Sequence, residues 1–221
     1  MKAMILAAGR GERMRPLTDH TPKPLLEVGK YSLIEHLVRS LVESGFVRLI
    51  VNHAHLGNQI EARLGTGAQF GATIEYSAEG ETGLETGGGI YKALPLLGDA
   101  PFLVVNGDIW TDYPFSRMHN MVPAGMAHLV MVDNPPQHPA GDFVLHDNSA
   151  ISNDLDGRLT YSGIGVYRPE MFAGCQPGKF PLAPILRKLA DESRLTGEYF
   201  PGNWSDVGTP ERLQVLRDQC G

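Results

Sequence analysis

Short stretches rich in apolar residues recur along the first half of the chain, each followed by polar or turn-forming residues. They cover 2–7, 47–52, 72–77 and 102–106. Stretches of this length, bounded by turn signals, are typical of strands. The pattern therefore predicts a strand at each of these places.

Between these stretches, apolar positions repeat at helical spacing. Ser32 and Glu35 stand three residues apart in the capping-box pattern that begins a helix. The apolar stripe that follows consists of Leu33, Ile34, Leu37, Val38 and Leu41. Gly45 is placed to end this helix, and further helices are expected over 59–64 and 88–97.

The second half of the chain shows a looser pattern. Strands are expected over 126–132, 142–146 and 159–167, and a helix over 184–190. Thr209-Pro210-Glu211 has the N-cap, first-turn proline and first-turn acid that open a final helix. Together the elements predict an α/β fold, a Rossmann-like three-layer α/β/α arrangement with a mostly parallel central sheet. Ligands of such sheets bind outside the carboxyl ends of the strands.

Composition and charge narrow this picture. A chain of 221 residues with 42% hydrophobic composition fits a single domain, 1–221, with halves of about 1–112 and 113–221. The formal net charge of −6 and the lack of a Lys/Arg cluster argue against a nucleic-acid partner. No apolar stretch approaches the roughly 20 residues of a membrane span, so we expect no membrane partner and a cytoplasmic location. Cys175 and Cys220 lack the spacing of a disulfide framework or a zinc site.

Residues 6–29 carry the strongest chemical signal. Gly9 and Gly11 lack a Cβ atom, so backbone N–H groups can approach phosphate oxygens closely. Arg13 is suited to grip β and γ phosphates with its planar guanidinium, and Lys23, held between two prolines, to sit against an α phosphate. The patterns GxxxxGK[ST] and GxGxxG both fail here, because the Gly-Lys pair and the third glycine are missing.

Gly-Arg-Gly-Glu-Arg-Met-Arg-Pro-Leu-Thr at 9–18 and Pro-Lys-Pro-Leu at 22–25 resemble the signature of the sugar nucleotidyltransferase family. The resemblance implies a fold of the nucleotide-diphospho-sugar transferase type. It also implies a reaction that joins a nucleoside triphosphate to a sugar 1-phosphate and releases pyrophosphate. Arg13 and Lys23 become the expected catalytic residues, the first half of the chain the nucleotide-binding half, and the second half the sugar-phosphate-binding half.

Two aspartates resemble the acidic motifs of the family. Asp108 follows the strand at 102–106 in a Gly-Asp pair, and Asp206 precedes a glycine turn and the final helix. Taken alone, either is more often a turn or capping residue. Mg²⁺ is usually held by one or two carboxylates plus substrate phosphates, so the resemblance implies that Asp108 and Asp206 bind Mg²⁺.

The substrate contacts also follow from the resemblance. The glycine-dense stretch 79–89 is similar to the family's nucleobase-binding loop, although its three consecutive glycines also fit a hinge or tight helix packing. The expected nucleotide-binding residues are Ala8, Gly9, Gly11, Glu12, Arg13, Lys23, Glu79, Gly83, Thr86 and Gly87. The expected sugar-binding residues are Asn106, Gly141, Asp142, Ser162 and Gly163, with Asn106 alternatively a turn asparagine. The family's Glu-Lys-Pro segment is missing, and only 153–158 stands near its place.

Across its length the chain most resembles bacterial uridylyltransferases of peptidoglycan recycling, which implies UTP as the nucleotide. Guanylyl- and thymidylyl- or uridylyltransferases acting on mannose or glucose 1-phosphate stay open as alternatives. A catalytically silent nucleotide-sugar sensor is an alternative from another class. Loss of Lys23 or of either aspartate would favour the sensor, and the chain keeps all three. The sequence does not indicate an oligomeric state.

Overall fold

The computed structural model of the chain describes residues 1–220, so the predicted domain end at 221 lies outside it, as does the thiol of Cys220. In chain order the strands are β1 (Ala3–Leu6), β2 (Glu27–Val28), β3 (Tyr31–Ser32), β4 (Arg48–His53), β5 (Thr73–Ala78), β6 (Phe102–Asn106), β7 (Ile109–Thr111), β8 (Ala127–Val132), β9 (Phe143–Leu145), β10 (Ile151–Ser152), β11 (Arg158–Tyr167), β12 (Leu195–Tyr199) and β13 (Trp204–Asp206). The α-helices are α1 (Leu33–Glu43), α2 (Gly57–Leu64), α3 (Glu85–Leu97), α4 (Ala183–Asp191) and α5 (Pro210–Cys220).

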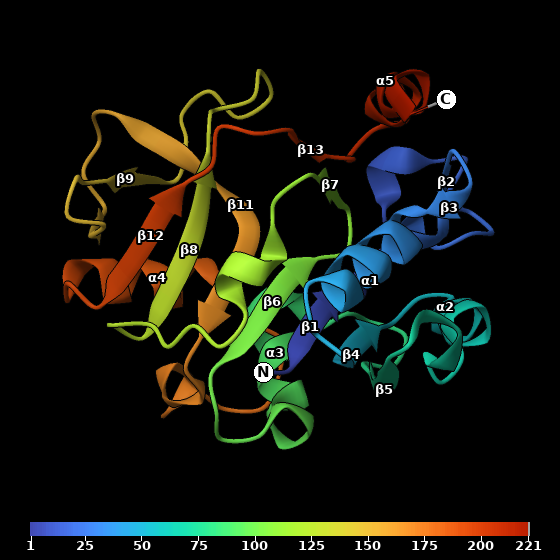
Figure 1. Cartoon of the computed structure of the whole chain (residues 1–221), viewed down its shortest axis with the longest axis horizontal. Coiled ribbons are helices and arrows are strands. Elements are labelled where there is room, and N and C mark those ends of the chain that lie inside the picture. Colours follow the sequence, from blue (N-terminus) through green and yellow to red (C-terminus); the bar gives the residue numbers. More distant parts are fainter. Residues whose placement is uncertain (221) are drawn as a thin grey trace.

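A nine-stranded sheet runs through the molecule, with its main path in the order β10-β9-β11-β6-β1-β4-β5 (Figure 1). β1 lies between β4 and β6 and is parallel to both, and β5 continues the parallel part beyond β4. β11 joins the second half to the first by pairing antiparallel with β6. β8 pairs with β11 and with β12, which is parallel to it. The predicted α/β fold with a mostly parallel central sheet is confirmed.

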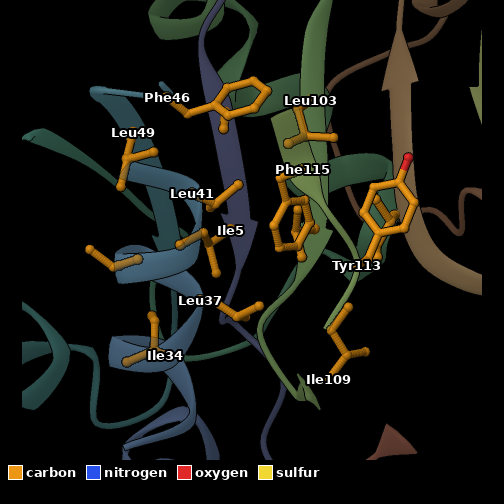
Figure 2. Packing of buried hydrophobic residues seen from close by; sticks show 14 of the residues in the cluster. Ile5, Ile34, Leu37, Leu41, Phe46, Leu49, Leu103, Ile109, Tyr113 and Phe115 are labelled. Atoms are coloured by element: carbon orange, nitrogen blue, oxygen red, sulfur yellow. The ribbon is translucent and has the colours of Figure 1, made fainter. Parts of the chain in front are cut away.

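Apolar side chains fill both faces of this sheet. Because side chains alternate along a strand, Ile5 of β1 packs on the face covered by α1 and α2, and Met4 on the face covered by α3 and α4. Figure 2 shows the first of these clusters, to which Ile34, Leu37 and Leu41 of α1 belong together with Ile5 of β1 and Leu103 of β6. The apolar stripe predicted for α1 therefore faces the sheet.

Most element positions agree with the sequence pattern, and the capping box of Ser32 and Glu35 is confirmed. The helix predicted at 88–97 begins earlier, at Glu85. Six strands were not predicted, namely β2, β3, β7, β10, β12 and β13. β12 contains Gly197 and Glu198 and has no continuous apolar run, so its strand conformation depends on its pairing with β8.

Within residues 1–220, no helix combines the length and the hydrophobicity that crossing a membrane requires.

Candidate functional site

A cavity of about 810 Å³ lies at the carboxyl edge of the parallel strands, where the segments that follow β1, β4, β5 and β6 meet. Its wall includes all the predicted nucleotide-binding residues except Gly87, namely Ala8, Gly9, Gly11, Glu12, Arg13, Lys23, Glu79, Gly83 and Thr86. Asn106 and Asp108 line it as well. The fold thus gathers residues of four separate loops around one space.

The glycine-rich loop after β1 is folded around Gly11. The φ angle of Gly11 is +66°, in the left-handed region that favours glycine. The hydroxyl of Thr18 donates to the Gly11 carbonyl oxygen at 2.8 Å and closes the turn. Gly9 differs, because no atom lies within 4 Å of the position where its Cβ would be. The loop therefore leaves room for a bound group at Gly9 and uses Gly11 to make its own turn.

Met14 fastens this loop to the rest of the molecule. Its side chain is fully buried in a small apolar cluster with Leu26, Val28, Leu33, Val207, Leu213 and Leu216. Arg13, its neighbour in the chain, lines the cavity instead. The cluster consequently holds Arg13 between the cavity and α5.

Lys23 is a buried cation of the site. Its side chain is only 9% exposed, and Nζ lies 2.5 Å from Oδ2 of Asp108. The residue begins a 3₁₀ turn, Lys23–Leu25, that follows Pro22 and contains Pro24. The prolines restrict the backbone on both sides, so the ammonium group is fixed before any substrate binds.

Strand pairing brings Asp108 and Asp206 together. β7 and β13 run antiparallel with Asp206 opposite Ile109, and the amide of Val207 donates to the Asp108 carbonyl oxygen at 2.8 Å. The Asp206 side chain does not line the cavity, but Gly208 does. In the described part of the chain, no group of three or more His, Cys, Asp or Glu residues is arranged to hold a metal by itself. Two partly exposed carboxylates, 37% and 30%, fit Mg²⁺, which completes its coordination with water and substrate phosphates.

Asn52 is a residue of the cavity wall that the sequence-based prediction missed. It is buried at the end of β4, where Oδ1 accepts from the amide of Ala7 at 2.8 Å and Nδ2 donates to Oε1 of Glu79 at 2.5 Å. Oε2 of Glu79 accepts in turn from the amide of Leu84 at 2.6 Å. One pair of side chains therefore ties β1, β4 and β5 to the loop before α3. The signal in the sequence was a polar residue at the carboxyl end of a buried strand.

The three consecutive glycines near the start of α3 are packed tightly. A Cβ on Gly87 would lie 2.6 Å from ring carbons of Phe180, and one on Gly88 would lie 2.2 Å from the Gly178 carbonyl oxygen. The backbone of Phe180 is bonded on both sides, to Leu84 at 3.1 Å and to Gly88 at 3.0 Å. Tight helix packing is thus the role that the structure gives these glycines. Gly87 is buried outside the cavity wall, in contrast to the contact predicted for it.

The same packing places Lys179 in the cavity wall, a position that was not predicted from the sequence. Nζ of Lys179 lies 3.8 Å from Oε1 of Glu85, another residue of the wall. His55 also lines the cavity, although it too was assigned no role from the sequence. The sequence Pro-Gly-Lys-Phe-Pro is typical of an ordinary loop. The position of Lys179 in the cavity wall therefore follows only from the packing of this segment against α3.

Of the five predicted sugar-binding residues, Asn106 is the one that lines the cavity. Gly163 lies directly behind it, since a Cβ there would lie 2.4 Å from Nδ2 of Asn106. Ser162 is buried, and its hydroxyl donates to the Val130 carbonyl oxygen at 2.7 Å. The side chain of Ser162 is therefore used inside the fold. It does not line the cavity, although a contact with the sugar was predicted for it.

Asp142 faces a pair of tyrosines, of which Tyr167 is buried and Tyr161 partly buried. Its Oδ2 accepts from the amide of Tyr161 at 2.9 Å, and the hydroxyl oxygens of Tyr161 and Tyr167 lie 2.5 Å apart. Burial raises the pKa of both hydroxyls, and the charge of Asp142 adds to the rise at Tyr161, so both stay protonated at neutral pH. Gly141 is buried against Asn134, with 2.8 Å between its Cβ position and Oδ1. These residues shape the second half of the molecule behind the cavity.

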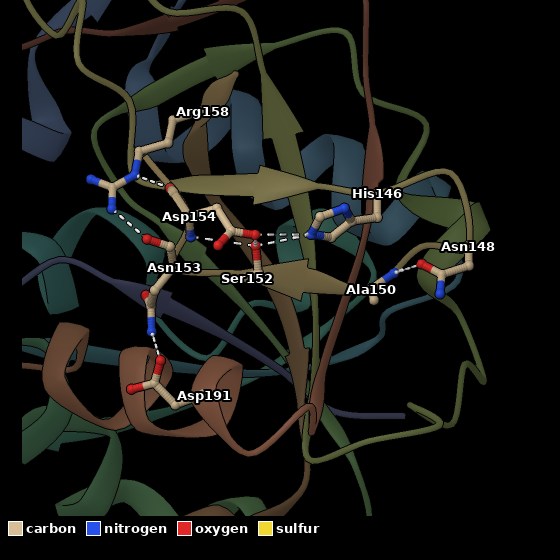
Figure 3. A network of polar contacts seen from close by, with 8 residues as sticks. All are labelled: His146, Asn148, Ala150, Ser152, Asn153, Asp154, Arg158 and Asp191. Carbon is tan, nitrogen blue, oxygen red and sulfur yellow. Dashed lines mark hydrogen bonds and ion pairs between the residues drawn. The ribbon is translucent and has the colours of Figure 1, made fainter. Parts of the chain in front are cut away.

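The loop 153–158, which stands near the place of the missing Glu-Lys-Pro segment, is folded onto itself. Arg158 donates from Nε to the Asp154 carbonyl oxygen at 2.6 Å and from Nη2 to that of Asn153 at 2.7 Å. Nδ2 of Asn153 donates to Oδ1 of Asp191 at 2.7 Å, at the end of α4. Figure 3 shows this network, in which Arg158 bonds to its own loop and Asn153 ties that loop to α4.

Comparisons with known proteins relate the whole chain to one family and one fold. Residues 2–147 match the family model described as Nucleotidyl transferase. The chain is 53% identical to the N-acetylmuramate alpha-1-phosphate uridylyltransferase of Neisseria meningitidis serogroup B, over 100% of this chain and 99% of that protein. A protein of the same name from Caulobacter vibrioides is 34% identical over 95% of this chain and 92% of its own length. A Bacillus anthracis structure assigned as a glucose-1-phosphate thymidylyltransferase superposes with a TM-score of 0.85 at 23% identity, over 100% of this chain and 95% of that one, which shows the fold.

Proposed function

Because the chain belongs to the nucleotidyl transferase family, we propose that it transfers a uridylyl group from UTP to N-acetylmuramate α-1-phosphate. The products are UDP-N-acetylmuramate and pyrophosphate. The observation that carries this proposal is the 53% identity to the Neisseria enzyme over both full lengths. We assign the reaction to peptidoglycan recycling in the cytoplasm.

The acceptor needs no side chain to remove a proton. A sugar 1-phosphate has a second pKa of about 6, so its attacking oxygen is largely ionised at neutral pH. This oxygen forms a bond to the α phosphorus of UTP as the bond from that phosphorus to the bridging oxygen breaks. Pyrophosphate leaves with the electron pair. The residues of the cavity therefore have to align the two substrates and neutralise charge.

Lys23 and Arg13 are the residues that we propose for this work. Lys23 stabilises the crowded oxygens on the α phosphorus, and its ion pair with Asp108 fixes the ammonium group at the cavity wall. Arg13 binds the β and γ phosphate oxygens with its planar guanidinium and stabilises pyrophosphate as it leaves. The open space at Gly9 admits the phosphates close to the backbone.

Enzymes of this family generally use a divalent metal ion, and we propose Mg²⁺ held by Asp108 and Asp206. When bound, the ion neutralises negative charge on the phosphate oxygens of the substrates. Strand pairing brings the backbones of the two residues close together, and both carboxylates are partly exposed, as ligands that share Mg²⁺ with water and substrate phosphates need to be.

The wall formed by Glu79, Gly83 and Thr86 is our proposed contact for uracil and ribose. Glu79 accepts from Asn52 and from the Leu84 amide, so its carboxylate is held in place before the nucleotide binds. Asn106, whose amide both donates and accepts, is the proposed contact for a sugar or ribose hydroxyl.

The test is a pyrophosphate-release assay on the purified chain with Mg²⁺. UTP, dTTP, GTP and CTP are each combined with a panel of sugar 1-phosphates that includes N-acetylmuramate, glucose and mannose 1-phosphate. We expect release with UTP and the muramate sugar. Release with another pair would keep the mechanism and replace the substrate, whereas no release with any pair would favour a catalytically silent sensor of nucleotide sugars.

A further inference from the structure

The carboxylate of Asp206 is the point where three parts of the chain meet. Its Oδ1 accepts a hydrogen bond from Nε2 of Gln137 at 2.6 Å, and the same oxygen forms an ion pair with Nη1 of Arg212. Gln137 stands in the loop between β8 and β9, and Arg212 in the first turn of α5. Both partners therefore bind the carboxylate at which a metal ion at Asp206 would also be held.

The guanidinium of Arg212 lies beside that of Arg13. The two groups meet at Gly208, where a Cβ would lie 2.3 Å from Nη2 of Arg212 and 3.4 Å from Nη2 of Arg13. Gly208 itself lines the cavity. Two like charges that converge at a cavity wall repel each other, and an anion that both can bind removes this cost. The arrangement points to a phosphate group as the ligand.

The pairing of Lys23 with Asp108 repeats this arrangement on the other acid. Each proposed metal ligand is thus paired with a cation: Lys23 lines the cavity, and Arg212 lies against Gly208, which also lines it. These cations repel a metal ion that binds the two carboxylates, so its binding favours their displacement. Each displaced cation is then left with its charge beside the cavity, where substrate phosphates can take the place of the carboxylate.

We propose that Arg212 is a further phosphate-binding residue that exchanges partners during the reaction cycle. It holds Asp206 until the metal ion and the triphosphate bind, and its guanidinium then joins Arg13 on the oxygens of the departing pyrophosphate. This inference rests on the proposed function, because it requires a metal ion and pyrophosphate in this cavity. It adds to that function a cation that neither the glycine-rich loop nor the acidic motifs contain.

A purely structural role for Arg212 makes a different prediction. In that case the side chain only orients Asp206, and any residue that still donates to Oδ1 would replace it. Arg212→Gln separates the two roles, because its amide can donate to Oδ1 but carries no charge. Arg212→Ala removes both the donor and the charge. Arg217→Ala removes the same charge elsewhere on the same helix, where Nε donates to the Glu27 carbonyl oxygen, and is the control.

Two binding measurements on the nucleotide-free chain provide the test. Mn²⁺ binding is followed by electron paramagnetic resonance of the free ion, and pyrophosphate binding in the presence of Mg²⁺ by titration calorimetry. We expect Arg212→Ala and Arg212→Gln to bind Mn²⁺ roughly five-fold more tightly, because a competing cation of a partly exposed pair is gone. Both should bind pyrophosphate about tenfold more weakly, because one charge-assisted contact is lost. Arg217→Ala should match the unmodified chain in both.

The opposite result for Mn²⁺ would overturn the inference. If Arg212→Ala weakens Mn²⁺ binding and Arg212→Gln restores it, Arg212 only orients Asp206. Unchanged pyrophosphate affinity in both variants would also exclude the exchange. Melting temperatures of all variants show that they are folded. Neither measurement uses UTP or a sugar phosphate, so a wrong substrate assignment would appear in the release assay and not here.

Discussion

The ammonium nitrogen of Lys23 lies 2.5 Å from Oδ2 of Asp108, although the two residues are 85 positions apart. The contact joins the loop after β1 to the end of β6, which are neighbouring strands of the sheet. It places the proposed catalytic cation against a proposed metal ligand. The function of either residue therefore depends on the other.

Replacement of Lys23 by methionine tests its role in the chemistry. The change keeps most of the side-chain volume and removes the charge, so we expect turnover to fall by about a thousand-fold, the scale of losing one preorganised charge contact in a transition state. The free energy of unfolding should change by no more than about 1 kcal/mol, because Asp108 is partly exposed and water can hydrate it.

Steady-state kinetics and denaturant unfolding measure these two quantities. The exposed Lys30→Met, close by in the sequence, is the control and should change neither. Retained turnover in Lys23→Met would remove Lys23 from the chemistry.

Asp108→Asn and Asp206→Asn should each shift the metal dependence of the reaction. Loss of one ligand charge weakens binding of a hard cation, so the Mg²⁺ concentration that gives half-maximal activity should rise by about tenfold or more. Activity at saturating UTP is measured against Mg²⁺ concentration, with the exposed Asp218→Asn on α5 as the control. A metal titration curve that does not move in either variant would contradict the assignment of that residue.

The sequence could predict what local patterns determine. The capping box of Ser32, the apolar strands and the turn at Gly11 all follow from neighbouring residues, and the structure has them. β13 could not be predicted, because its three residues become a strand only by pairing with β7. That pairing is also what sets Asp206 beside Asp108.

Residues of the site were missed where their position depends on packing between distant segments. Lys179 reaches the cavity because Phe180 is fastened to the start of α3, and no feature of its own segment indicates this. Ser162 was expected at the sugar because of its place in the chain, yet the irregular part of β11 turns its hydroxyl to Val130. Spacing along a chain does not determine which way such a side chain points.

Asn52→Leu should destabilise the fold, because Asn52 satisfies two buried partners. The change leaves the amide of Ala7 and one oxygen of Glu79 without their bonds. We expect the free energy of unfolding to fall by about 2–4 kcal/mol, the scale of leaving buried polar groups unsatisfied, one of them charged. Denaturant unfolding measures the loss, and Asn58→Leu, on the exposed side of α2, is the matched control. Equal stability of the two variants would show that the Asn52 bonds contribute little.

Two glycine-to-alanine changes should affect different properties, one the stability and the other the binding of UTP. Gly88→Ala has no space beside Gly178, so we expect a loss of about 1–3 kcal/mol in stability from overpacking, although alanine is favoured in an exposed helix. Gly9→Ala has open space and should unfold like the unmodified chain, but its methyl group would occupy room at the cavity and weaken UTP binding. Thermal unfolding and nucleotide titration distinguish these outcomes. Normal UTP affinity in Gly9→Ala would show that phosphates do not approach the backbone there.

The carboxylate of Glu35 should make stability depend on pH in the acid range. Its Oε2 accepts from the amide and hydroxyl of Ser32 at 2.9 and 2.8 Å and from Nη2 of Arg63 at 2.9 Å. Burial acts to raise the pKa of Glu35, but the bonds from Arg63 and Ser32 outweigh it, so the pKa is lowered in the fold. A lowered folded-state pKa means that this stabilisation is present above the unfolded pKa of about 4.3 and is lost as the pH falls below it.

Glu35→Gln should therefore lose about 1–2 kcal/mol of unfolding free energy at neutral pH, because a charged acceptor at a helix start is replaced by a neutral one. The difference between the two proteins should stay constant from neutral pH to about 5 and shrink below about 4, where the native carboxylate takes up a proton. Urea unfolding across this range measures it, with Glu43→Gln, exposed at the other end of α1, as the control. A difference that does not depend on pH would mean that the hydrogen bonds act through geometry alone and that the charge of Glu35 contributes nothing to the fold.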